Sequence, residues 1–411
     1  MKAVASEPRT PAAPEANRHG NGRSPSGGPA LFAYGFRPFF LLAGIYATVA
    51  PPWWVAMLYL GAPPPSGLMP LAWHAHEMLY GFVAAAVAGF LLTAVPSWTG
   101  RRGYAGAPLA ALVMLWLAGR LAMTLSGTPV GLLAAAIDLA FVPALGLILL
   151  PALMREGKRR NLVFILVLTF LFVSNLQFHL EGAASTAPLR LGLNTMLFLL
   201  TLLGGRILPA FTSAGLKARG LEIRIERHPL LERAVLVAAG AVLAVDLLLP
   251  DGMLAGGVAA LGALLLALQL GRWQGYRCLG DPLLWVLHIA YAWLPVCLAL
   301  KAAALFGLPL AGNAWVHALT AGAMATMIVG VMSRAGLGHT GRALVAPPPM
   351  PAAYLLLTVA ALARVFGPLL YPAASPWWHA LSAGLWSIAF LVFTVVYAPM
   401  LLRPRFDGKP G

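Results

Sequence analysis

The chain has 411 residues, of which 60% are hydrophobic and only 10% are charged. This balance excludes a soluble fold and predicts a polytopic helical membrane protein. Lysine and arginine outnumber aspartate and glutamate by 28 to 13. In a soluble protein this excess would suggest nucleic acid, but in a membrane protein it is typical of cytoplasmic loops. We therefore expect the membrane lipid, and no nucleic acid, as a partner.

Residues 1–30 are rich in Pro, Ala, Gly, Ser and Arg and lack the apolar segment of a signal peptide. This composition predicts a disordered cytoplasmic tail. We expect a single transmembrane domain over residues 31–402 and a short cytoplasmic tail over 403–411. Cys278 lies in a polar loop and Cys297 inside an apolar stretch, so we expect no disulfide between them.

Twelve apolar stretches of spanning length follow the tail, and Pro, Gly and charged residues separate them. They cover residues 36–60, 71–96, 106–126, 129–152, 161–181, 188–211, 231–249, 252–271, 282–306, 314–334, 351–371 and 376–401. Twelve helices with both termini in the cytoplasm place nearly all basic residues on the cytoplasmic side, as the positive-inside rule requires. The exceptions are Arg120, Arg190, Lys301 and Arg364.

This topology puts five histidines from four helices into one outer layer. They are His74 and His76 in the second helix, His179 in the fifth, His317 in the tenth and His379 in the twelfth. Imidazole is a common ligand of haem iron and copper, and ionisable groups inside a span indicate function. A solvated or hydrogen-bonded side chain is the alternative for any single one. His288, on the inner side of the ninth helix, and His339, in a cytoplasmic loop, complete the candidate metal ligands.

The second and tenth predicted helices resemble each other in register. His76 aligns with His317, Gly81 with Gly322, Gly89 with Gly330, and Thr99-Gly100-Arg101 with Thr340-Gly341-Arg342. The sixth helix carries a partial third copy, in which residues 209–212 resemble residues 96–99. Because these helices are four apart, we expect three pseudo-repeats of four helices, with sites at the repeat interfaces.

This internal similarity suggests how a haem would be held. If the second and tenth helices face each other, His76 and His317 are the expected axial ligands of one haem. Arg120 and Arg364 lie in the outer third of the third and eleventh helices, where they would bind its propionates or extend to the lipid headgroups. His74 is two residues from His76, about 200° around a helix, so it would serve a second metal or a supporting bond.

Seven segments, spread in order from about residue 31 to 370, closely resemble the NnrS family. They are Gly35–Phe40, Trp73–Met78, Gly89–Gly100, Leu115–Arg120, Gly205–Thr212, Pro282–Trp285 and Leu337–Arg342. The resemblance implies a twelve-span bacterial inner-membrane protein that binds haem, expected to be b-type, and copper. It also implies protection against nitric oxide and nitrosative stress, often alongside denitrification. His74, His76, His317 and His339 match the family motifs, whereas Ser97 stands where the family usually has Asn.

The family also invites comparison with haem–copper oxidases and nitric-oxide reductases, which have three arcs of four helices; this is an analogy. The chain lacks their adjacent His-His pair and His-Pro-Glu motif, so a copper site would need other residues, such as His179 with His74 or His288. Whether nitric oxide is bound, sensed or turned over stays open. The alternatives are a secondary transporter or exporter using the intramembrane Asp138 and Asp246, and an assembly factor without cofactors.

Overall fold

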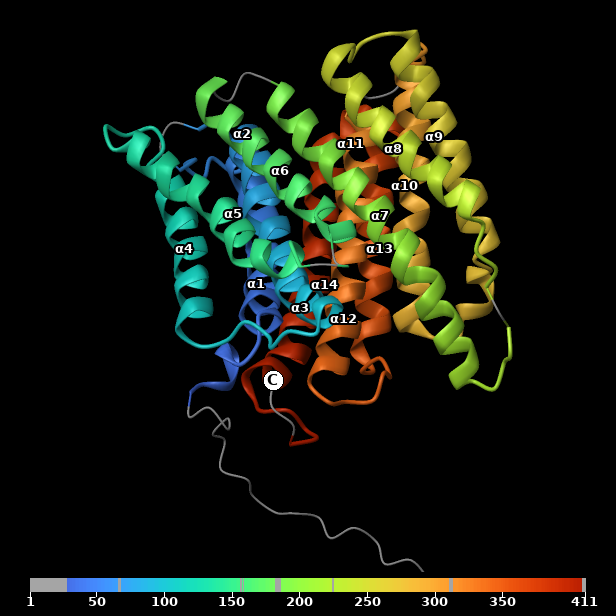
Figure 1. The fold of residues 1–411 in the computed structure, drawn as a ribbon. Coiled ribbons are helices and arrows are strands. Elements are labelled where there is room, and N and C mark those ends of the chain that lie inside the picture. The colour runs from blue at the N-terminus through green and yellow to red at the C-terminus, as the bar shows by residue number, and fades with distance from the viewer. Residues whose placement is uncertain are drawn as a thin grey trace, which may run out of the picture.

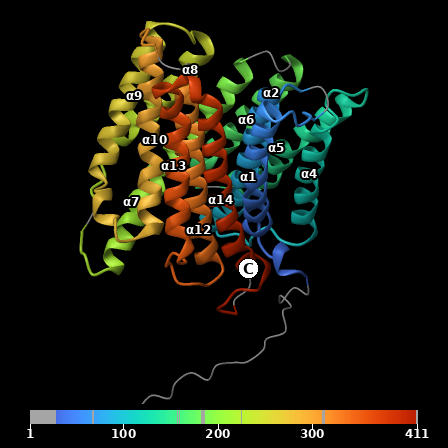
Figure 2. The same ribbon diagram turned by 180° about the vertical axis from the view of Figure 1, so that it is seen from behind.

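The computed structural model describes residues 28–65, 68–155, 157, 159–181, 186–223, 225–309 and 313–408. All regular structure in these ranges is helical. The helices run up and down in one bundle, and both ends of the described chain lie at the same end of it (Figures 1 and 2). We call this the terminal end and the opposite one the far end. Residues 1–27 of the expected N-terminal tail lie outside the described ranges.

The twelve predicted helices are all present. Ten spans are uninterrupted helices: α1 (Phe36–Tyr59), α4 (Ala107–Met123), α5 (Gly131–Leu153), α6 (Val163–Glu181), α7 (Ala187–Ala218), α8 (Pro229–Leu248), α9 (Met253–Arg272), α10 (Pro282–Leu305), α13 (Pro349–Leu370) and α14 (Ser375–Leu402). Short 3₁₀ turns occur at Ala30–Phe32, Arg159–Asn161, Gly275–Cys278 and Pro372–Ala374. Helix starts follow local chemistry: Pro occupies the first turn of α10, and the Asp281 side chain accepts a hydrogen bond from the Leu283 amide at 3.0 Å.

The second and tenth spans are interrupted, and both in the same way. The second consists of α2 (Pro70–His76), a π-helix (Glu77–Val83) and α3 (Ala84–Thr99). The tenth consists of α11 (Ala314–His317), a π-helix (Ala318–Met324) and α12 (Ala325–His339). In each span the seven-residue π-helix begins directly after the aligned histidine. The sequence similarity between these spans therefore extends to a rare backbone feature, which often marks functional sites.

Ten spans are long and apolar enough to cross a membrane. The other two are α4, which is apolar but has only 17 residues, and α8, which carries Glu232, Arg233 and Asp246. An all-α polytopic membrane protein is therefore confirmed. Cys278 and Cys297 are both free, as predicted, and both are buried.

The three spans that carry the internal similarity form the centre of the bundle. Among the ten long apolar spans, α2–α3, α7 and α11–α12 are the most buried. Glycines allow their close packing: a Cβ on Gly81 would lie 2.7 Å from Tyr46 of α1, and one on Gly322 would lie 2.4 Å from Trp293 of α10. The second span thus packs on the first as the tenth packs on the ninth. The third copy is less exact, because α7 is a regular α-helix throughout.

Candidate functional site

Two groups of histidines occupy the far end of the bundle, and α2 contributes to both. His74 and His76 are separated by about 200° around this helix. His76 is completely buried against α5 and α6, whereas His74 lines a cavity between α1, α11, α13 and α14. One turn of helix therefore supplies an imidazole to each group.

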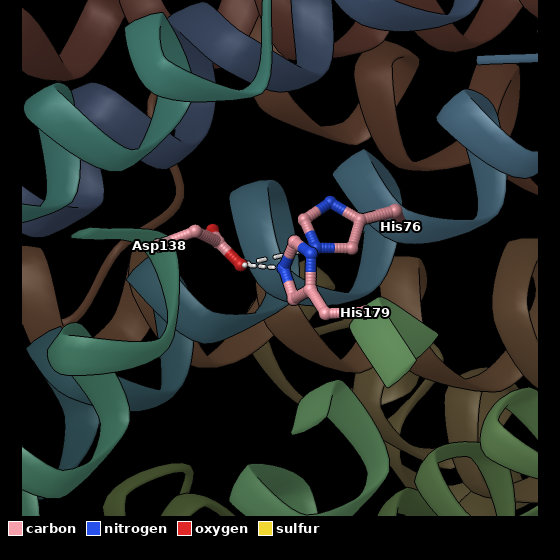
Figure 3. A group of neighbouring side chains, drawn as sticks. All are labelled: His76, Asp138 and His179. Atoms are coloured by element: carbon pink, nitrogen blue, oxygen red, sulfur yellow. Dashed lines mark hydrogen bonds and ion pairs between the residues drawn. The ribbon is translucent and has the colours of Figure 1, made fainter. Parts of the chain in front are cut away.

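The first group, which we call the Asp138 cluster, joins His76 of α2, Asp138 of α5 and His179 of α6. The Oδ2 atom of Asp138 lies 3.2 Å from Nε2 of His76 and 3.0 Å from Nε2 of His179. Figure 3 shows the carboxylate pointing at both rings. One ligand atom from each residue fits within 4.8 Å of the others, a spacing that suits a metal ion. His76 and Asp138 are buried and His179 is largely buried.

Further polar groups orient this cluster. His76 Nδ1 lies 2.9 Å from Oε1 of Glu77, the residue that follows it. Arg120 of α4 donates to the same Glu77 oxygen at 2.6 Å and also pairs with Asp138. Tyr46 of α1 donates to the other Glu77 oxygen. A carboxylate on the far nitrogen of an imidazole is the usual partner that orients a metal-ligating histidine.

The charge balance of the cluster leaves room for one more cation. With neutral imidazoles, Asp138 and Glu77 carry two negative charges and Arg120 carries one positive charge. Unbalanced charge inside a membrane protein is costly, so the remaining negative charge favours a proton on an imidazole or a monovalent metal. Imidazole nitrogens bind copper well, as they also bind zinc, iron and nickel.

The second group, which we call the His74 cavity, has a volume of about 240 Å³. His74, His317, His379 and Arg364 line it, together with mainly apolar side chains. His74 stacks on the indole of Trp54, with ring centroids 4.2 Å apart. The Arg364 guanidinium lies over the same indole at 5.1 Å. A buried guanidinium beside three imidazoles makes this cavity suitable for an anionic ligand that also carries a metal.

One imidazole nitrogen at this cavity lacks a partner. Nδ1 of His74 is buried and has no hydrogen-bond partner among the described residues. By contrast, Nδ1 of His379 lies 2.6 Å from the Tyr59 hydroxyl. An orphaned buried nitrogen is costly unless something binds it. The donor set and the apolar walls therefore fit a haem, with His74 and His317 as the nitrogens available from different helices.

The structure regroups the predicted site residues. His76 and His317, expected to face one haem, belong to different groups: both ring nitrogens of His76 have partners in the Asp138 cluster, and His317 lines the His74 cavity. The two histidines occupy equivalent positions on their spans, but each span faces different neighbouring helices. Arg364 lines the His74 cavity, whereas Arg120 binds Glu77 and Asp138.

The two remaining candidate histidines lie toward the terminal end. His288 Nε2 lies 2.9 Å from the Thr212 hydroxyl, and the nearby Cys278 has a raised pKa because its thiol is buried. His339 stacks on Tyr34, with ring centroids 6.1 Å apart. The structure therefore brings neither of them into the two far-end groups.

The sequence did not show which intramembrane charges pair with one another. Arg120 pairs with Asp138, and Lys301 of α10 pairs with Asp246 of α8, which also accepts a hydrogen bond from Asn194 at 2.7 Å. Each of these acids and bases lies inside an apolar stretch of the sequence. An unpaired charge is costly there, so an opposite charge at the same depth is the favoured partner.

A comparison with curated proteins finds no match to this chain. The NnrS protein family matches residues 30–405, which is nearly the whole chain and includes both histidine groups. The chain belongs to the NnrS family.

Proposed function

We propose that this integral membrane protein binds haem and copper and protects a bacterial cell against nitric oxide and nitrosative stress. The observation that carries the proposal is the His74 cavity, where imidazoles from α2, α11 and α14 meet one buried arginine in apolar surroundings. Family membership supports the link to the nitric-oxide response. The expected location is the inner membrane, with both termini cytoplasmic and the two histidine groups on the outer side.

The haem would be held by His74 and His317, with Arg364 pairing with its carboxylates. Haem iron would supply a binding site for nitric oxide. The protein's own residues would exclude water through the apolar walls and fix the His74 ring against Trp54. Nitric oxide dissolves in lipid, so a cavity within the membrane is well placed to receive it.

Copper would be held by His76, Asp138 and His179, with Glu77 orienting the His76 ring. Copper would supply a second redox-active metal. Arg120 and Tyr46 hold Glu77 in place, so the ligand geometry is organised by the protein. The remaining negative charge of the cluster matches a monovalent ion.

The transporter alternative gains no support from the buried acids. Asp138 is paired with Arg120, and Asp246 is paired with Lys301. Each carboxylate thus lies against a cation on another helix, whereas a transport pathway needs acids that exchange their partner. Nitric-oxide reduction remains compatible with two metal centres, and an electron donor would then be required.

The test is the visible spectrum and metal content of the full-length protein, purified from haem- and copper-replete cells. We expect a Soret band that His74→Ala and His317→Ala weaken or shift. His179→Ala should lower copper content while leaving the Soret band in place. His228→Ala is the control, since this histidine lies on the surface of a loop at the terminal end. A replete preparation without a Soret band would refute the haem assignment.

A further inference from the structure

A second cavity lies between α3, α7 and α12. Its volume is about 50 Å³, and every side chain that lines it is hydrophobic. Ala86, Met196 and Met327 contribute from the three central spans, and Phe40 contributes from α1. This cavity contains none of the histidines or charged residues of the two far-end groups.

The second cavity follows the His74 cavity along the same three central spans. On each span, its first lining residue comes three positions after the last residue that lines the His74 cavity. The steps run from Val83 to Ala86, from Leu193 to Met196 and from Met324 to Met327. Three residues correspond to about one helical turn. The two cavities are therefore stacked, with the apolar one closer to the terminal end.

The chemistry of the walls decides what can enter. A bound water needs roughly 10–15 Å³ and two to four polar partners, and apolar cavities of sufficient size stay dry and take up xenon. This cavity has the space but offers no oxygen or nitrogen from its side chains. Ions are excluded more strongly, because no charge compensates them. The remaining occupants are small, neutral and apolar.

The cavity also borders the surface of the bundle. Phe90, Leu203 and Val331 line it and are only partly buried. These side chains lie near the middle of their spans, where the surroundings are hydrocarbon. A lipid-soluble gas can therefore approach from the bilayer without crossing a polar layer.

We propose that this apolar cavity is a docking site for a small uncharged gas and that it leads to the His74 cavity. The gas would enter from the lipid, reside between the three central spans and move about one helical turn into the His74 cavity. That the physiological gas is nitric oxide rests on the proposed function. Gas docking itself follows from the walls and position of the cavity and needs no haem.

The experiment is xenon pressurisation of crystals of the full-length protein, with the xenon located by its anomalous scattering. We expect a xenon site bordered by Ala86, Met196 and Met327 in the wild type. Val87→Phe should abolish it, since Val87 lines the cavity and the larger ring fills the space. Val142→Phe is the matched control, because Val142 is also buried but lines neither cavity.

Three outcomes would overturn the proposal. They are xenon only in the His74 cavity, xenon in the second cavity of Val87→Phe, and copper bound by the methionine sulfurs in place of xenon. If Val87→Phe does not fold, Ala86→Leu provides the same test. The wild-type xenon experiment does not depend on either variant. A xenon site in a protein without a Soret band would refute the proposed haem function but support gas docking.

Discussion

At the residue scale, the far end of the bundle depends on a few buried charges that are arranged to satisfy one another. Asp138 accepts from Asn175 at 2.8 Å in addition to Arg120 and the two histidines. Removing one partner from such a group leaves a buried charge unpaired, which is more harmful than removing both. The cluster thus joins α2, α4, α5 and α6 through a few buried charged and polar groups.

Arg120→Gln should lower the free energy of unfolding by about 3–5 kcal/mol, because it leaves the buried Glu77 and Asp138 carboxylates without their cation. Asp138→Asn should lower it by less, because Arg120 keeps its ion pair with Glu77. The double variant should lose less than the sum of the two. Thermal unfolding in detergent, analysed as a double-mutant cycle, measures this coupling. The control is Asp251→Asn, since Asp251 is 86% exposed. Additive losses would show that Arg120 and Asp138 do not act as a pair.

At the element scale, the two π-helices determine which way the histidines face relative to the rest of their spans. A π-helix closes i→i+5 hydrogen bonds and accommodates an additional residue, so removing one residue restores regular α-geometry. Such a deletion rotates α2 or α11 by about 100° relative to the following helix. The positions of His74, His76 and His317 thus depend on the interruption of their spans.

Deleting Met78 from the first π-helix should remove both haem and copper, because α2 contributes to both groups. Deleting Thr320 from the second π-helix should remove haem and spare copper, because α11 contributes only His317. The Soret band and the copper content of the purified variants distinguish these outcomes, and each variant serves as the control for the other. Retention of both cofactors after the Met78 deletion would contradict this role of the π-helix.

Close packing of helices supplies a second prediction at this scale. Gly81→Ala places a Cβ 2.7 Å from Tyr46, which holds Glu77, so we expect a loss of about 1–3 kcal/mol in unfolding free energy. Gly384→Ala meets no atom within 4 Å, so it should be neutral or stabilise the protein by up to about 1 kcal/mol. Thermal denaturation monitored by circular dichroism compares them. Equal melting temperatures would argue against the packing role of Gly81.

At the scale of the whole molecule, twelve spans return the chain to the end where it starts. The basic residues lie mainly in the loops of this terminal end, so it should face the cytoplasm. The histidine groups then lie on the outer side of the membrane. Because His74 and His76 are two residues apart on α2, the His74 cavity and the Asp138 cluster lie at the same depth but on opposite sides of this helix.

Cysteine labelling in intact cells tests this orientation. In a chain without Cys278 and Cys297, Asp251→Cys should react with a membrane-impermeant maleimide, because this exposed residue lies between α8 and α9 at the far end. Arg102→Cys, in the exposed loop between α3 and α4, should react only after the membrane is permeabilised. The reverse pattern would show that the histidine groups face the cytoplasm.

The sequence by itself determined the helices and the layer in which the histidines lie. Each span must satisfy its own backbone hydrogen bonds in lipid, so hydropathy and length mark it locally. Proline, glycine and charge then mark its ends, as at Pro282 and Pro349. The alignment of His76 with His317 also correctly marked two spans with the same unusual backbone.

Only the tertiary structure decided which of these residues meet. A side chain's neighbours depend on the rotation of its helix and on the helices packed around it, and neither is local in sequence. His76 and His317 therefore occupy equivalent positions yet belong to different groups, while His74 joins His317 across the bundle. The partners of Arg120 could not be predicted from the sequence for the same reason, because Asp138 and Glu77 reach it from two other helices.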